Sequence, residues 1–128
     1  MLLFDTHAFV WLASAPKELS SPARRAIRDH ADRLYFSSIS ALEIAILVKR
    51  QRLTLPMQPA EFIERALKHH GIHEIPVDRN VAIVSTALPD IHNDPFDRII
   101  VATAQISGLA IVSRDRLLRS YPEVRIIW

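Results

Sequence analysis

Short apolar runs that alternate with helix-like segments are the feature that most constrains the fold of this chain. Residues 2–4, 34–36 and 109–113 form such runs, and their side chains are mostly apolar on both faces of an extended strand. This pattern is typical of strands buried on both sides. Strands separated by helices run parallel and are joined by right-handed crossovers. The alternation therefore predicts an α/β fold, a three-layer α/β/α sandwich with a central parallel sheet.

Helix-start and helix-stop residues predict the other elements. The expected helices cover residues 6–13, 20–31, 40–50, 60–70, 81–87 and 95–107, a short helix follows Arg114-Asp115, and further strands cover 73–77 and 124–127. Thr6 is a candidate N-cap of the first helix, and Pro76 indicates an edge strand or strand end. Both glycines, Gly71 and Gly108, fall where helices stop, so none remains for a glycine-rich phosphate-binding loop.

Composition bounds the class of protein. The 128 residues are expected to form one domain, residues 1–128, and 49% apolar residues supply a core. The absence of cysteine excludes disulfides and thiolate nucleophiles. No apolar stretch approaches about 18 residues, so we expect a soluble cytoplasmic protein with no membrane partner.

Thirteen of the sixteen basic residues are arginine, a side chain that suits phosphate binding. Arg24, Arg25 and Arg28 share a helix face that either binds RNA or is simply solvated.

Residues 93–104 combine a strong helix start with two carboxylates. Asp94 is a good N-cap and Pro95 suits the first helical position. Asp97 lies in the first turn, where the helix dipole favours an acid. On this stretch alone, both acids are explained by capping.

Four acids are nevertheless expected to meet at one edge of the sheet. Asp5 and Asp115 follow the carboxyl ends of two strands, and Glu43 and Asp97 lie in the first turns of helices that begin at the same edge. An isolated Glu43 could instead reach the surface. Clustered carboxylates repel one another unless a cation neutralises them. Oxygen ligands without sulfur favour Mg²⁺ or Mn²⁺, which would activate water for displacement at phosphorus.

Four motifs, in this order, resemble the acidic motifs of PIN-domain nucleases. D-T-H follows the first strand, S-x-x-x-x-E opens the most apolar helix, D-P-F-D-R-I-I-V-A-T-A starts another helix, and S-R-D follows the penultimate strand. Within this family the chain is most similar to the VapC-type toxins of prokaryotic toxin–antitoxin pairs. The resemblance covers essentially the whole chain.

The resemblance implies a PIN-like fold and a metal-dependent endoribonuclease that uses Mg²⁺ or Mn²⁺. It further implies the toxin of a type II pair, an RNA substrate cut to leave a 5′-phosphate and a 3′-hydroxyl, a cognate antitoxin and a homodimer. Asp5, Glu43, Asp97 and Asp115 match the family's catalytic, metal-binding acids, while Asp94 is assigned to the N-cap with a metal contact as the alternative. Two other functions stay open, an RNA-processing nuclease without antitoxin and a non-catalytic PIN module that binds RNA or protein.

Several neighbours of these acids have two interpretations. Ser113 and Thr6 either hold a carboxylate or a metal-bound water through their hydroxyls, or serve as strand-end and cap residues. Arg98 and Arg114 either clamp phosphate or pair with the adjacent acids.

The histidines and the first helix carry weaker signals. His7 and His92 lie near the predicted site and could touch substrate, but the six histidines show no metal-ligand spacing. Residues 9–12 form either a groove for an antitoxin peptide or a dimer contact, or part of the core.

Overall fold

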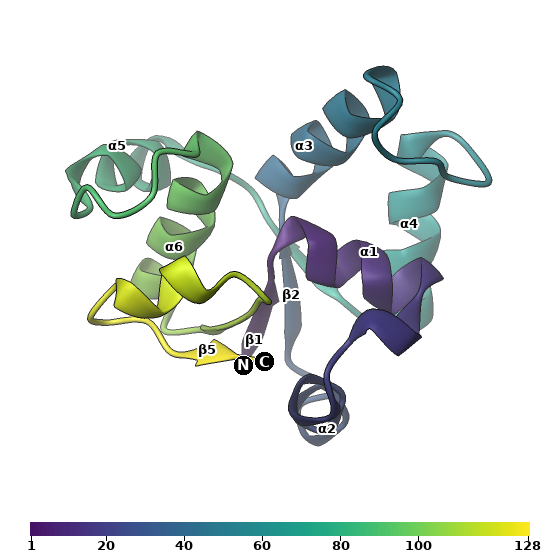
Figure 1. Cartoon of the computed structure of the whole chain (residues 1–128), viewed down its shortest axis with the longest axis horizontal. Helices are drawn as coiled ribbons and strands as arrows, with labels where there is room; N and C mark the ends of the chain where they lie inside the picture. The colour runs from purple at the N-terminus through teal and green to yellow at the C-terminus, as the bar shows by residue number, and fades with distance from the viewer.

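The computed structural model describes all 128 residues and has five parallel strands at its centre (Figure 1). The strands are β1 (Leu2–Phe4), β2 (Leu34–Ser37), β3 (His73–Ile75), β4 (Ala110–Val112) and β5 (Ile126–Ile127). They lie in the order β3-β2-β1-β4-β5, and every neighbouring pair is parallel. The predicted parallel α/β fold is therefore confirmed.

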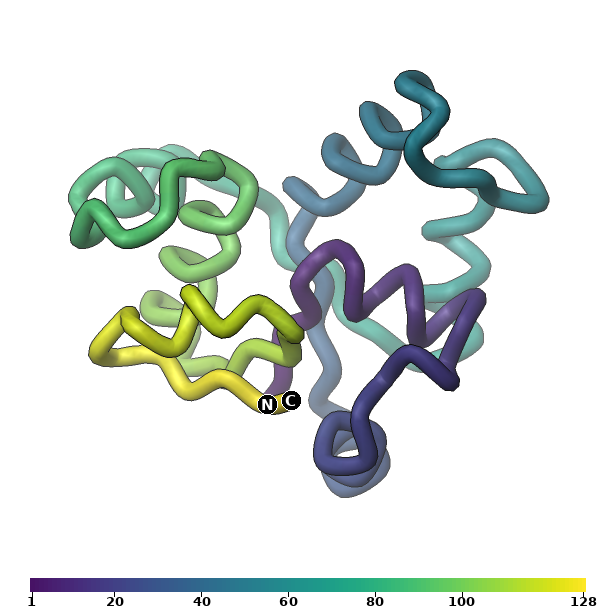
Figure 2. The backbone as a smooth tube through the Cα atoms, viewed as in Figure 1, coloured from purple at the N-terminus to yellow at the C-terminus, as the bar shows by residue number.

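Helices cover both faces of the sheet. They are α1 (Thr6–Ser14), α2 (Ser21–Asp29), α3 (Ser38–Lys49), α4 (Pro59–His70), α5 (Arg79–Ala87) and α6 (Pro95–Ser107), with 3₁₀ turns η1 (Pro16–Glu18) and η2 (Arg116–Ser120). Leu2 and Phe4 of β1 pack with α1, α2 and α4, whereas Leu3 packs with α6 and η2 in a second cluster. In Figure 2, segments coloured purple to blue lie on one side of the molecule and those coloured green to yellow on the other.

The start of α1 differs from the prediction. Asp5, rather than Thr6, is the N-cap, because its carboxylate accepts a hydrogen bond from the Ala8 N–H at 2.8 Å. Thr6 is already helical, and its hydroxyl donates to the hydroxyl of Ser40 at 3.0 Å. This hydrogen bond connects α1 to α3. Thr6 therefore neither caps the helix nor binds a carboxylate, the two roles considered from the sequence.

The start of α3 also differs, because the helix begins two residues earlier than expected. Ser37 ends β2 and its hydroxyl accepts the Ile39 N–H at 3.2 Å, so the strand passes directly into the helix. Glu43 consequently lies in the second turn of α3 rather than in the first.

Other element ends agree with the sequence more closely. Gly71 and Gly108 end α4 and α6 in the left-handed region, with φ of 64° and 67°. Strand β3 lies at the sheet edge, as Pro76 indicated, whereas β5 is two residues long instead of four. None of the helices has both the length and the apolar character that crossing a membrane requires.

The strand order places a crevice at the carboxyl ends of β1 and β4. From β1 the chain first adds β2 and β3 on one side, and then returns to add β4 and β5 on the other. Ligands of open α/β sheets bind where the order reverses in this way. Asp5 directly follows β1, and Asp115 lies three residues beyond β4.

Candidate active site

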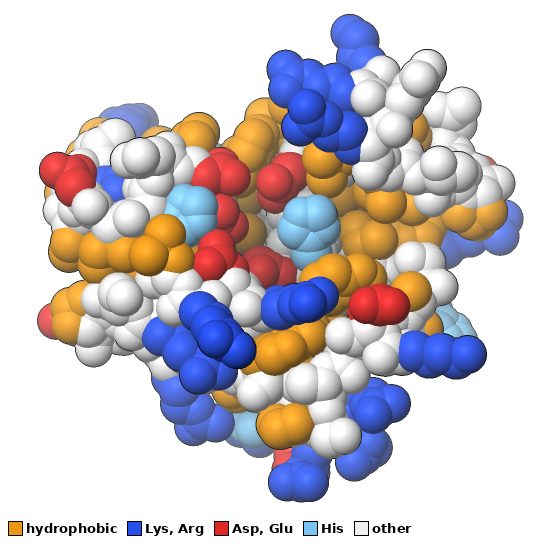
Figure 3. Space-filling model, viewed as in Figure 1, with side chains coloured by type: hydrophobic (Ala, Val, Ile, Leu, Met, Phe, Trp, Pro, Cys, Tyr) orange, Lys and Arg blue, Asp and Glu red, His pale blue; other side chains and the backbone are white.

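A cavity of about 370 Å³ opens at the carboxyl ends of β1 and β4. Figure 3 shows acidic side chains gathered in a hollow at the centre of this face, with histidine beside them. The lining residues are Asp5, Thr6, His7, Trp11, Glu43, His92, Asp94, Asp97, Arg114 and Asp115. The structure thus brings together all four acids that the sequence singled out, and adds Asp94 and His92.

Asp5 is the most buried of these acids, with 7% of its surface exposed. Burial raises the pKa of the Asp5 carboxyl, and hydrogen bonds from the Ser113 side chain and the Ala8 N–H oppose that rise. Ser113 also accepts the Asp115 N–H at 3.0 Å. Its hydroxyl therefore links two of the acids, which corresponds to the carboxylate-holding role considered from the sequence.

Asp97 projects from the first turn of α6, and its side chain is 20% exposed. Burial, together with the negative charges of Asp94, Glu43 and Asp5, raises the pKa of the Asp97 carboxyl to about 7, although His92 opposes part of this rise. The direction shows that the cluster is electrostatically unfavourable when every carboxylate is ionised. A bound cation would relieve this repulsion.

Glu43 reaches the same cavity from α3 and is half-buried there. It takes part in none of the hydrogen bonds or ion pairs of the structure. An acid that faces other acids without a donor is a natural ligand for a divalent ion.

Asp94 and Asp115 both cap helical turns and also line the cavity. Asp94 accepts the Phe96 N–H at 2.9 Å, which confirms its predicted N-cap role, and Asp115 accepts the Leu117 N–H at 2.9 Å. Each cap uses one carboxylate oxygen; the other oxygen of Asp94 has no hydrogen-bond partner, whereas Oδ2 of Asp115 lies 2.9 Å from Nε2 of His92.

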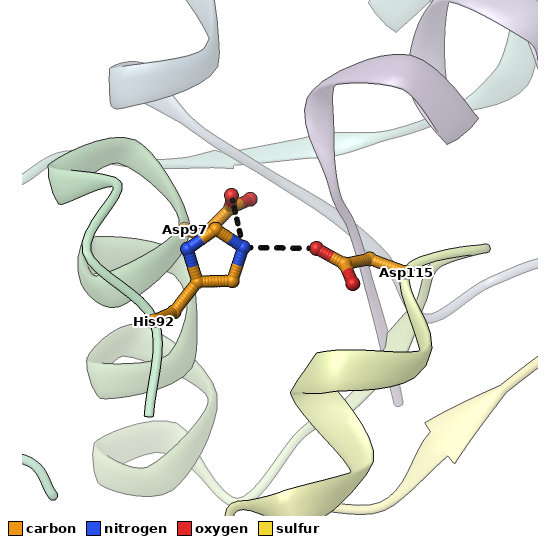
Figure 4. A group of neighbouring side chains, drawn as sticks. All are labelled: His92, Asp97 and Asp115. Carbon is orange, nitrogen blue, oxygen red and sulfur yellow. Dashed lines mark hydrogen bonds and ion pairs between the residues drawn. The ribbon is translucent and has the colours of Figure 1, made fainter. Parts of the chain in front are cut away.

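His92 is the residue that sequence reasoning undervalued. Its Nε2 lies 2.9 Å from Asp115 Oδ2 and 3.2 Å from Asp97 Oδ2, between the two acids (Figure 4). The three ligand atoms lie within 4.8 Å of one another, which suggests a metal site. His92 is two residues before Asp94, in a loop that carries no spacing signal.

The hydrogen bonds of the His92 ring define its tautomer. Nδ1 lies 3.1 Å from the Asp94 N–H, which can only donate, so Nδ1 must accept. In the neutral ring the proton is then on Nε2, which donates to the two carboxylates. Coordination of a metal through Nε2 would place a proton on Nδ1, facing another N–H. The geometry thus favours carboxylate oxygens as ligands and His92 as their hydrogen-bond donor.

Arg98 has neither of the roles considered from the sequence. Its guanidinium makes no ion pair with the acids and instead donates to backbone carbonyls at the end of α5 and in the loop between α5 and α6. The acceptors lie at 3.0 to 3.5 Å and belong to Ser85, Thr86, Leu88, Pro89 and His92. Arg98 therefore shapes the loop that presents His92, together with Tyr121, whose hydroxyl accepts the His92 N–H at 3.1 Å.

Residues 9–12 divide between the core and the cavity. Phe9 and Val10 are buried in the core, which is the second of the two interpretations given above. Trp11 and Leu12 pack against that core while remaining partly exposed, and Trp11 borders the active-site cavity.

Comparison with known proteins decides the family. The PIN-domain model matches residues 2–124. The chain belongs to the PIN-domain family. Among relatives of this PIN-domain protein, "Ribonuclease VapC22" of Mycobacterium tuberculosis is 34% identical over 130 residues, covering 99% of this chain and 98% of the relative. The predicted VapC type is therefore confirmed.

Solved structures agree with this PIN-like fold. A VapBC2 complex from Rickettsia felis bound to a promoter DNA fragment has a chain with a TM-score of 0.73 and 13% identity, covering 98% of this chain and 96% of that one. A chain of a toxin–antitoxin complex from Klebsiella pneumoniae has a TM-score of 0.69 and 24% sequence identity. The match covers 97% of this chain and 95% of that one. At these identities the likeness concerns the fold alone.

Proposed function

We propose that this PIN-domain protein is a metal-dependent endoribonuclease and the toxin of a type II toxin–antitoxin pair. The observation that carries the proposal is the meeting of four carboxylates, from four separate segments, in one cavity at the reversal point of a PIN-like sheet. The kinship with a VapC ribonuclease supports RNA as the substrate.

The acids fit a hard divalent cation. Asp5, Glu43, Asp97 and Asp115 would hold Mg²⁺ or Mn²⁺, with Asp94 as a possible additional oxygen donor. Such an ion, when bound, lowers the pKa of water and stabilises charge on the phosphate and the leaving oxygen. The expected products carry a 5′-phosphate and a 3′-hydroxyl.

The protein's own groups orient these acids. The Ala8 N–H holds Asp5, the Leu117 N–H holds Asp115, and Nε2–H of His92 bridges Asp115 and Asp97. Because these donors are fixed before substrate arrives, little reorganisation is needed when the phosphate enters. Arg114 lines the same cavity and is placed to contact a phosphate oxygen.

An antitoxin partner is supported by the solved relatives, which are toxin–antitoxin complexes. A protein that covers the acidic cavity would block RNA from reaching it. A homodimer is a further expectation of the family resemblance.

Cleavage of a mixed RNA pool tests the proposal. The purified protein is assayed with Mg²⁺ or Mn²⁺, with EDTA, and as Asp97→Asn, Asp94→Asn and Asp90→Asn variants. Asp90 is an exposed acid outside the cavity and serves as the matched control. We expect loss of cleavage with EDTA and with Asp97→Asn, partial loss with Asp94→Asn, since Asn still caps, and none with Asp90→Asn. RNA left intact by the wild type under every metal condition would contradict a nuclease function.

A further inference from the structure

A second cavity, of about 810 Å³, lies next to the active-site cavity. Its lining residues are Arg114, Asp115, Arg116, Arg119 and Trp128, and we refer to it as the arginine groove. Arg114 and Asp115 line both cavities, so the groove adjoins the acid cluster. Figure 3 shows Lys or Arg side chains directly beside the acidic hollow, on the same face. A chain that passes over the acids can therefore continue along a basic surface.

The arginines of the groove are free to bind a ligand. Arg114, Arg116 and Arg119 are exposed, and none of them takes part in an ion pair or side-chain hydrogen bond. Arg116 and Arg119 are three residues apart in η2, and a 3₁₀ turn of three residues puts such side chains on one side. Three unpaired guanidinium groups along one groove suit successive phosphates of a polyanion.

Aromatic rings border the same path. Trp11 of the active-site cavity lies 5.7 Å, between ring centroids, from Trp128 of the arginine groove. The ring centroid of His7 lies 5.8 Å from that of Trp11. Both tryptophans are only partly buried, and each lines one of the two cavities. A row of rings beside cations is the combination by which proteins hold unpaired bases and their backbone together.

The other arginine cluster lacks these features. Arg24, Arg25 and Arg28 are exposed on α2, but they line neither cavity, and no aromatic pair includes an α2 residue. This helix face has similar charge without rings and without a connection to the acids. It therefore provides an internal control for charge alone.

We propose that the arginine groove and the Trp11–Trp128 pair bind single-stranded RNA on one side of the phosphate to be cut. The arginines contact backbone phosphates, and the indole rings stack on bases, which requires bases that are not paired in a duplex. The inference rests on the proposed nuclease function, because it names the form of RNA that function acts on. Stacking and phosphate contacts carry little base information, so this subsite favours single strands over duplexes more than one sequence over another.

Binding without cleavage tests this inference. A fluorescently labelled, mixed-sequence 12-nucleotide RNA is titrated with the protein in EDTA, and anisotropy gives the Kd for the wild type, Arg116→Ala/Arg119→Ala and Arg24→Ala/Arg28→Ala. Both double variants remove two positive charges. We expect the groove variant to bind at least about tenfold more weakly, with a salt slope smaller by about 1.4 for two lost phosphate contacts. The α2 variant should bind like the wild type, and thermal melts should show all three folded.

Intrinsic fluorescence supplies a second readout, because Trp11 and Trp128 are the only tryptophans of the chain. RNA stacked on them should quench the emission, and Trp128→Leu should lose part of that quenching and bind more weakly. A duplex of the same sequence should bind and quench less than the single strand.

Three results would overturn the inference: no RNA binding by the wild type, equal weakening by the two double variants, or a duplex bound as well as the single strand. Binding is measured in EDTA, so the outcome is separate from that of the cleavage assay. A protein that binds RNA through the groove but never cleaves it would refute the proposed function alone. A protein that cleaves RNA but binds it independently of the groove would refute this inference alone.

Discussion

The two walls of the active-site cavity are built in different ways. The first wall, Asp5 and Glu43, comes from a strand end and a helix interior, and its geometry follows from local rules such as the N-cap of α1. The second wall, His92, Asp97 and Asp115, includes one residue, His92, from a loop that Arg98 and Tyr121 hold in place. The sequence predicted the acids of both walls, whereas the position of His92 in the second wall depends on contacts between distant segments. If one ion joins the walls, damage to either should have the same consequence.

The largest expected effect comes from removing one acid of each wall. Asp5→Asn and Asp97→Asn should each lower the RNA cleavage rate about a thousandfold, because each removes a charged oxygen ligand from a shared ion. Residues that act as a unit are strongly non-additive, so the double variant should be little worse than either single one. Single-turnover cleavage measures all three rates. Additive losses would mean that the walls act independently.

A pH effect on stability should separate the metal-free from the metal-bound protein. The pKa of Asp97 is about 7 in the folded protein, whereas the ordinary value of this side chain is 3.8, so the folded state binds an extra proton between these pH values. Stability in EDTA should then fall as pH rises from about 4 to 7, by up to about 4 kcal/mol for this side chain. Urea unfolding at each pH measures the free energy of unfolding. The Asp97→Asn variant should show a much weaker dependence of stability on pH. An equally steep dependence in that variant would show that groups other than Asp97 cause it.

Arg98 offers a way to break the second wall alone. Arg98→Ala leaves several carbonyls without a donor and should destabilise the protein by about 3 kcal/mol, as followed by urea unfolding. Arg98→Lys should rescue little, because one ammonium cannot reach carbonyls arranged around a planar fork. Wild-type stability of the Arg98→Lys variant would show that a positive charge at this position is enough to hold the loop, without the planar guanidinium group.

The smallest effect concerns the ring of His92. In the metal-free protein with a neutral His92 ring, ¹⁵N NMR should find the ring proton on Nε2, since the Asp94 N–H donates to Nδ1. His7 is exposed and provides the reference ring. A proton on Nδ1 of His92 would contradict the assigned hydrogen bonds and would make Nε2 a candidate metal ligand.

The sequence was sufficient for what depends on local chemistry. Alternating apolar runs predicted the parallel sheet, and Gly71 and Gly108 predicted the ends of α4 and α6. The placement of Asp5 and Asp115 at one sheet edge followed from the strand-end rule. The first cap was misassigned because Asp5 and Thr6 are both good cap residues, and only the hydrogen bond to Ala8 distinguishes them.

The roles of His92 and Arg98 could not be predicted in the same way. Arg98 binds carbonyls up to thirteen residues away, and His92 meets Asp115 across 23 residues, so neither partner follows from spacing along a helix or strand. One signal was available. A cation in the first turn of a helix is disfavoured by the dipole, so Arg98 needed acceptors from outside its helix.

The most direct test of one shared ion is a calorimetric titration of Mn²⁺ into the metal-free protein. Wild type, Asp5→Asn, Asp97→Asn and the control Asp90→Asn are compared under one set of conditions. We predict that both wall variants bind Mn²⁺ at least about tenfold more weakly, while Asp90→Asn binds like the wild type. Wild-type affinity in either wall variant would contradict the claim that the two walls hold the ion together.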